Sequence, residues 1–155
     1  MKPKLVVFSL LIVVFWSCNN TENQSTMKTN SESHSELKGT WELVGFYNFK
    51  DNVIVDSFKA NPNFRQLKMY TDTKVMWCKH LPADSSEWFG YGTYKFKNDT
   101  LSEVLDFGSA VMDEVIAEKK KFRFEITLTE NRFEQIELDE EGNRIYSENY
   151  KRIEK

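Results

Sequence analysis

Phe-Arg-Phe-Glu-Ile-Thr-Leu-Thr, at residues 122–129, is the stretch that decides the fold class. Its apolar residues alternate strictly with residues that are charged or carry a hydroxyl group. Successive side chains of a β-strand point to opposite faces, so this pattern predicts a strand with one face in a core and the other in water. The stretch therefore indicates a sheet that buries one of its faces.

Eight further segments alternate in the same way or are rich in aromatic and β-branched residues. They lie near residues 40–48, 53–58, 65–70, 74–80, 89–97, 100–107, 132–138 and 144–153, and the quoted strand extends over 120–129. Turn sequences such as Asn98-Asp99 and Glu141-Gly142-Asn143 favour hairpins between neighbouring segments. About nine short strands predict an all-β, up-and-down antiparallel β-barrel, because closing the sheet removes its exposed edges.

One segment is predicted to be helical, Ser109–Glu118. Its apolar residues fall on one side of a helix, namely Val111, Met112, Val115 and Ile116. Two roles fit such a helix. It either forms a lid over the barrel mouth or serves as a short crossover that plugs the barrel end.

The first 17 residues have the pattern of a secretory signal. Lys2 and Lys4 precede the apolar run Leu5–Trp16, which is too short to span a membrane as a helix of about 20 residues. Ser17 and Cys18 follow, and the whole resembles a bacterial lipoprotein precursor. That resemblance implies that residues 1–17 are removed and that Cys18 is lipidated. The alternative is an ordinary signal peptide with an incidental cysteine.

Residues 18–37 are expected to form a flexible linker, because Asn, Ser, Thr, Glu and Gln dominate them. Residues 38–155 have the length of one domain with a single core. Without residues 1–17 the chain has 19 basic and 24 acidic residues. This mild negative charge argues against a nucleic-acid partner. The expected partner is the membrane, reached through the lipid anchor and most simply the outer membrane of a bacterial envelope.

A family resemblance rests on an ordered set of motifs. Gly39-Thr40-Trp41 opens the first strand and Arg152 lies on the last. Between them stand Lys68-Met69-Tyr70, Val75-Met76-Trp77, Gly90-Tyr91-Gly92-Thr93-Tyr94 and Glu103, and Tyr150-Lys151 precedes Arg152. Together they resemble the calycin superfamily, especially lipocalin-like domains of Bacteroidetes-type lipoproteins. The resemblance implies a barrel with a cavity and no established reaction. It also implies structural roles for Gly39, Trp41 and Arg152, with the arginine stacked over the tryptophan at the closed end.

Charged residues share strand faces with apolar ones. Glu103 alternates in step with Leu101 and Leu105, and Arg152 alternates in step with Glu148. A buried carboxylate is costly unless it is paired. We therefore expect an internal ion pair, either Glu103–Arg152 or Glu148–Arg152.

An eight-stranded barrel holds either its own side chains or one small ligand. The candidate ligand-binding residues are aromatic and apolar wall residues together with possible polar anchors: Met76, Trp77, Tyr91, Tyr94 and Phe124, with His80 and Glu103. The alternative for each wall residue is plain core packing, which aromatic residues in strands commonly adopt.

Catalysis has little support in the sequence. His80 is the only histidine after residue 34, which excludes a site built from several histidines, and no cofactor is expected. Cys78 and His80 share a strand face, but no third residue is evident to orient them as a nucleophilic pair. Two non-catalytic functions remain. The chain is either a tethered protein that binds a small hydrophobic or amphipathic molecule, or an envelope interaction module whose barrel is filled.

Overall fold

The computed structural model describes residues 36–61, 63–81 and 88–155. The strands in this part of the chain match the predicted segments closely, which confirms the all-β prediction. They are β1 (Gly39–Lys50), β2 (Val53–Lys59), β3 (Arg65–Tyr70), β4 (Lys74–His80), β5 (Trp88–Lys97), β6 (Thr100–Gly108), β7 (Lys121–Leu128), β8 (Arg132–Leu138) and β9 (Arg144–Glu154), with the helix α2 (Ala110–Glu118) after β6. The predicted signal peptide and Cys18 lie outside the described residues.

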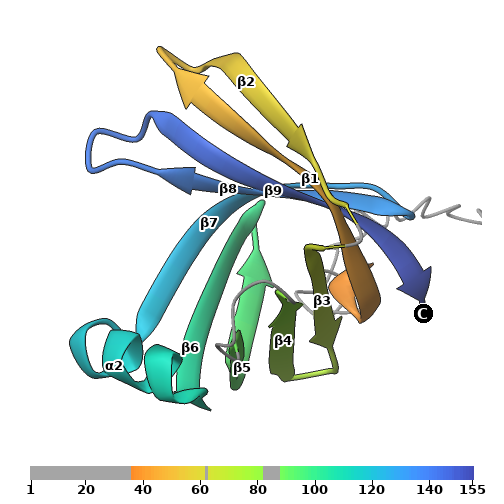
Figure 1. Cartoon of the computed structure of the whole chain (residues 1–155), viewed down its shortest axis with the longest axis vertical. Helices are drawn as coiled ribbons and strands as arrows, with labels where there is room; N and C mark the ends of the chain where they lie inside the picture. Colours follow the sequence, from red (N-terminus) through yellow and green to blue (C-terminus); the bar gives the residue numbers. More distant parts are fainter. Residues whose placement is uncertain (1–35, 62, 82–87) are drawn as a thin grey trace, which may run out of the picture.

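The sheet closes on itself. Each strand runs antiparallel to the next in the order β1, β3, β4, β5, β6, β7, β8, β9, and β9 pairs with β1. β2 lies outside this ring, because it pairs with Gly45–Lys50 of β1, whereas β3 pairs with Gly39–Glu42. In Figure 1 the β1–β2 hairpin accordingly extends upward beyond the ring. The predicted up-and-down barrel is confirmed, with one hairpin protruding from it.

Aromatic side chains fill one end of the barrel. Phe133 stacks on Tyr150 with ring centroids 4.5 Å apart, and the edge of Phe133 meets Trp41 at 4.8 Å. Such offset and edge-on contacts are the favourable arrangements of aromatic rings. This cluster makes one end a packed core.

A smaller apolar cluster lies at the other end, where α2 packs against β5 and β6. Met112 and Ile116 of the helix are buried there with Trp77 and Leu105. Val111 and Val115, which were predicted to share the buried side, are more than a third exposed. The helix is therefore anchored by two side chains rather than four. No helix in the described ranges is long and apolar enough to cross a membrane.

The packed end also places the three residues of the family motif. The Arg152 guanidinium lies 3.9 Å above the ring centroid of Trp41. Gly39 has φ of +124°, and a Cβ there would lie 2.3 Å from the carbonyl oxygen of Glu154, so a larger residue does not fit. The structure thus places Gly39, Trp41 and Arg152 together at the closed end, as the resemblance implies.

The structure corrects the C-terminal end of the predicted linker, which included Leu37. Its side chain is fully buried in the aromatic cluster, and its carbonyl oxygen accepts a hydrogen bond of 2.8 Å from Nε1 of Trp41. The polar residues before it hid this role, because composition was averaged over the whole segment. The folded domain therefore includes Leu37.

Candidate functional site

A cavity of about 300 Å³ lies inside the barrel, on the α2 side of the aromatic cluster. Ligand pockets in proteins begin at about this volume. It is lined from β3, β4, β6, α2, β7, β8 and β9 by Gln66, Lys68, Trp77, Lys79, Glu103, Leu105, Met112, Lys119, Phe122, Phe124, Gln135, Glu137, Tyr146 and Glu148. The lining divides into a polar floor and apolar walls.

One half of the floor is an ion pair between Lys68 of β3 and Glu103 of β6. Their side chains are each 3% exposed, and Nζ lies 3.2 Å from Oε1. The same ammonium donates to Oε1 of Gln135 at 2.5 Å, and the hydroxyl of Tyr70 donates to Glu103 at 2.7 Å. The buried charges are thus paired and also hydrogen-bonded, which is the condition for keeping them inside a protein.

The other half of the floor surrounds the carboxylate of Glu148 on β9. The hydroxyl of Tyr150 donates to Oε2 at 2.6 Å, and Nε2 of Gln66 donates to Oε1 at 3.1 Å. Nε2 of Gln135 makes a longer contact of 3.4 Å with Oε2. Gln135 therefore links the two halves, because its oxygen accepts from Lys68 while its nitrogen faces Glu148. Four strands contribute to one continuous network.

Two tyrosines in this network are held neutral. Burial raises the pKa of Tyr70 well above its usual value, and the charge of Glu103 raises it further. Burial and the charge of Glu148 act in the same way on the pKa of Tyr150. Both hydroxyls consequently stay protonated at physiological pH and donate to the two carboxylates.

The walls are aromatic and close-packed. The indole of Trp77 lies against β5 at its cross-strand partner Gly90, where a Cβ would come within 2.9 Å of the ring. Phe122 and Phe124 of β7 face the cavity from the other side. At the mouth, the ammonium of Lys79 lies 5.6 Å from the Trp77 ring centroid and that of Lys119 lies 5.5 Å from the Phe122 centroid. The cavity is therefore amphipathic, with a charged floor and ring-lined sides.

The expected ion pair with Arg152 is wrong. The arginine donates instead to the carbonyl oxygens of Glu130, Lys38 and Glu36 at the closed end. Glu103 is buried as expected, but Lys68 neutralises it. Arg152 does share a strand face with Glu148, but it sits at the far end of β9. The strand face of Arg152 was predictable from the alternation, whereas its position along the barrel axis was not.

Three of the seven predicted ligand-binding residues line the cavity, namely Trp77, Glu103 and Phe124. Tyr94 is buried outside the cavity lining, packed edge-on to Tyr70 at 4.9 Å, and its hydroxyl donates to the carbonyl oxygen of Thr71. Burial raises its pKa to about 12.

The other three predicted residues, Met76, His80 and Tyr91, do not line the cavity. On β4, Met76 is one residue and His80 three residues from the inward-facing Trp77. Because successive side chains of a strand point to opposite faces, both point outward. Tyr91 is the cross-strand partner of Met76 and shares its face. The structure therefore places all three outside the cavity lining, in contrast to their predicted place on the barrel interior.

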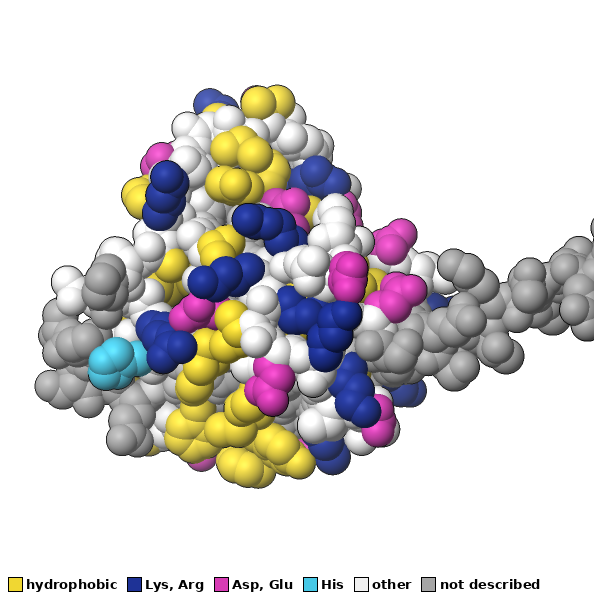
Figure 2. All heavy atoms as spheres, turned by 90° about the vertical axis from the view of Figure 1, so that its right-hand side faces the viewer, with side chains coloured by type: hydrophobic (Ala, Val, Ile, Leu, Met, Phe, Trp, Pro, Cys, Tyr) yellow, Lys and Arg dark blue, Asp and Glu magenta, His cyan; other side chains and the backbone are white. Residues whose placement is uncertain are grey.

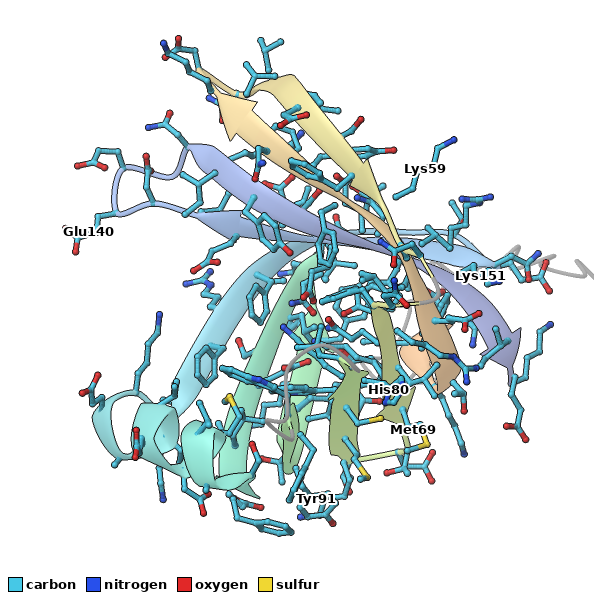
Figure 3. All side chains as sticks on the ribbon, viewed as in Figure 1. Lys59, Met69, His80, Tyr91, Glu140 and Lys151 are labelled. Carbon is cyan, nitrogen blue, oxygen red and sulfur yellow. The ribbon has the colours of Figure 1, made fainter. Side chains whose placement is uncertain are left out.

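The outer face carries an apolar row instead. Met69, Met76, Tyr91 and Phe107 are successive cross-strand partners on β3, β4, β5 and β6. Phe107 is 52% exposed, and both methionines are 37% exposed. Figure 2 shows hydrophobic side chains gathered at the lower end of the molecule, and in Figure 3 Met69 and Tyr91 lie there, away from the barrel interior. We call these four residues the outer row.

Gln66, Lys68 and Gln135 line the cavity but were not among the predicted site residues. On β3 the polar Gln66 and Lys68 point inward while Leu67 and Met69 lie on the other face, the reverse of an ordinary half-buried strand. The available signal was Glu103, because a carboxylate predicted inside the barrel requires a buried cation. The predicted cation was Arg152, whereas the structure places Lys68 beside Glu103.

Comparisons with known proteins support the fold. No family model matches the chain, and no curated protein does. A solved structure of a lipocalin-like protein from Bacteroides uniformis superposes with a TM-score of 0.52 and 15% identity, covering 76% of this chain and 99% of the other. An uncharacterised protein from Bacteroides eggerthii gives a TM-score of 0.49 and 15% identity, covering 74% and 98%. The superposition on the Bacteroides uniformis protein confirms the predicted resemblance at the level of the fold, which is lipocalin-like.

Proposed function

We propose, from the lipocalin-like fold and the amphipathic cavity inside it, that the chain is a non-catalytic protein that binds one small amphipathic molecule in the barrel. The observation that carries the proposal is the division of the cavity into ring-lined walls and a hydrogen-bonding floor. A barrel that is filled by its own side chains has a mostly apolar interior. Here, in contrast, five buried polar side chains surround a space of about 300 Å³. Pockets that bind small molecules combine mostly apolar walls with a few polar groups that fix orientation.

The walls define where the apolar part of the ligand lies. Trp77 and Phe122 are part of the cluster that packs under α2, and both border the cavity. Aromatic rings give a large contact area, and their faces accept flat ligands. The polar end of the ligand then lies at the floor, near Gln66 and Glu148.

Two matched substitutions test this placement. Phe122 and Phe107 are both phenylalanines on strands, but Phe122 lines the cavity and Phe107 belongs to the outer row. The neutral fluorescent probe N-phenyl-1-naphthylamine is titrated into the wild type, Phe122→Ala and Phe107→Ala. Loss of the aromatic wall is expected to weaken binding at least fivefold in Phe122→Ala and to leave Phe107→Ala near the wild type.

Native mass spectrometry of the domain purified from cells complements the titration. A single co-purified small molecule that is lost or weakened in Phe122→Ala supports the proposal. The absence of both saturable probe binding and any co-purified molecule would overturn it. Equal binding by the wild type and Phe122→Ala, with loss in Phe107→Ala, would move the function to the outer row.

The outer row favours a second candidate, an envelope interaction module. The four side chains of the outer row lie in one line across four strands, three of them are exposed, and exposed apolar patches commonly mark interaction sites. If the outer row carries the function, Phe107→Ala abolishes capture of an envelope partner and Phe122→Ala does not. Capture by the two variants, compared with their probe titrations, therefore separates the two functions.

The tether is a further part of the proposal. Lipidation of Cys18 would hold the barrel at the outer membrane, because two or more acyl chains give stable anchoring. Support comes from the signal-like residues 1–17 and the cysteine that follows Ser17. Mass spectrometry of the N-terminal peptide from membranes tests it, with Cys18→Ser as the control. An unmodified cysteine in the mature protein would remove the anchor and leave the binding proposal intact.

A further inference from the structure

The cavity floor has an excess of negative charge. Lys68, Glu103 and Glu148 are each less than 10% exposed, and the single ammonium is already paired with Glu103. Among the described residues, no cationic side chain lies within ion-pair distance of Glu148. Its carboxylate is held only by neutral donors, from Gln66, Tyr150 and Gln135. A buried carboxylate without a counter-charge is the costliest feature of this interior.

A second observation at the same place points to a missing donor. Oε1 of Gln66 is buried and has no hydrogen-bond partner in the described part of the chain. Its amide nitrogen is already committed to Tyr150 and Glu148, so the orientation that leaves the oxygen free is the one the network requires. Buried acceptors in proteins are nearly always satisfied. Gln66 and Glu148 both line the cavity and both accept, so the floor lacks a donor and a positive charge at one spot.

From these two acceptors we infer that the cavity takes an organic ammonium, a small amine whose aromatic or aliphatic body lies against Trp77 and Phe122. The inference rests on the proposed function and names its ligand class. The ammonium donates to Glu148 and Gln66, supplying the counter-charge and the missing donor together. The aromatic walls also favour a positively charged ligand, because the faces of aromatic rings attract cations. One such contact is present within the protein, since the Lys68 ammonium lies 5.7 Å from the Phe124 ring centroid.

The charged side chains at the mouth of the cavity do not reverse its preference for a cation. Lys79 and Lys119 are balanced in part by Glu137, and Lys119 and Glu137 are exposed. Water and salt screen exposed charges, whereas the buried floor is screened much less. The floor therefore decides which polar end is accepted.

Three probes with one phenyl body test the inference: 2-phenylethylammonium, 2-phenylethanol and 3-phenylpropanoate. Each is used at neutral pH to displace N-phenyl-1-naphthylamine from the barrel, with calorimetry as a direct check. The ammonium is expected to bind at least tenfold more tightly than the alcohol, and the carboxylate more weakly than both. In Glu148→Gln the ammonium is expected to lose at least tenfold while the alcohol changes less than threefold.

Glu140→Gln is the matched control, because it removes the same charge from an exposed position in the β8–β9 turn, outside the cavity lining. It is expected to change ammonium binding less than threefold, and an equal loss in both variants would overturn contact at Glu148. Equal affinity for ammonium and alcohol, or preference for the carboxylate, would overturn the ligand class. The proposed function survives that result, because the neutral fluorescent probe and its displacement report cavity binding whatever the head group.

Discussion

Arg152 covers the indole of Trp41, with its guanidinium carbon 3.9 Å from the ring centroid. The same guanidinium donates to the backbone carbonyls of Glu36, Lys38 and Glu130. These three carbonyls belong to the segment before β1 and to the β7–β8 turn. One side chain therefore joins the start of the barrel, its last strand and a hairpin turn, and closes the end around the tryptophan.

Removal of this arginine should destabilise the fold. Arg152→Met loses a cation–π contact and charge-assisted hydrogen bonds, and we expect the free energy of unfolding to fall by about 2–3 kcal/mol. Arg152→Lys keeps the charge over the ring but cannot reach three carbonyls, so the expected loss is about half as large. Urea denaturation measures both. Lys151→Met is the control, because this neighbour makes an exposed ion pair with Glu42 that is worth less than about 1 kcal/mol.

The buried pair Lys68–Glu103 makes a sharper prediction. Lys68→Met leaves the Glu103 carboxylate buried with only the Tyr70 hydroxyl, and we expect a loss of about 3–5 kcal/mol. Neutralising the carboxylate as well, in Lys68→Met/Glu103→Gln, should recover most of that loss. Arg65→Met, which breaks the exposed contact with Glu42, should cost less than about 1 kcal/mol. A double variant as unstable as the single one would show that the charge of Glu103 is not what Lys68 balances.

The strand order of this barrel could be predicted from the sequence, because the alternating segments indicate strands and the turn sequences between them indicate hairpins. Residues 122–128 alternate as a half-buried strand should, and each neighbouring pair of strands from β3 onward meets through antiparallel pairing. The family motif fixed the closed end, because Trp41 and Arg152 are cross-strand partners. Periodicity therefore predicts which residues share a face, and short connections predict which strands are neighbours.

The depth of a residue along the barrel could not be read in the same way. Glu103 and Arg152 both point inward, yet one lies at the cavity floor and the other at the closed end. Strand register sets that depth, and bulges such as the one between Tyr91 and Gly92 change it without a clear sequence signal. Strand β3 adds a second obstacle, because its inward side chains include Gln66 and Lys68. Hydrophobic patterning assigns such a strand the wrong face whenever the interior is a polar site.

The close contact of Trp77 with Gly90 predicts a specific non-additivity. An alanine Cβ at position 90 would lie 2.9 Å from the indole, so the ring must move toward the cavity. We expect Gly90→Ala to cost about 1–3 kcal/mol through overpacking and to weaken N-phenyl-1-naphthylamine binding. In a Trp77→Leu background the clashing ring atoms are gone, and the added alanine should cost less than about 0.5 kcal/mol. Additive losses in this cycle would mean that position 90 is constrained by its backbone rather than by the ring.

The two buried tyrosines predict that the barrel loses stability in alkali. Burial first, and then the charges of Glu103 and Glu148, raise the pKa of Tyr70 and Tyr150 in the folded state. An unfolded tyrosine ionises near pH 10, so below that pH the contribution of both residues is complete. Above about pH 10 the unfolded chain releases protons that the folded chain retains. The free energy of unfolding should then fall by about 1.4 kcal/mol per pH unit for each tyrosine.

Tyr70→Phe measures the contribution of one of these two tyrosines to stability. At pH 7 the substitution loses the hydrogen bond to Glu103, at a cost of about 1–2 kcal/mol. Between about pH 10 and 11 its stability should fall less steeply than that of the wild type, by a slope that rises from about half a proton towards one proton, because lysine ionisation is common to both proteins. Urea titrations at half-unit pH steps give the two slopes. Parallel slopes would show that Tyr70 ionises equally easily in the folded and unfolded chains, and the polar floor would then be open to water.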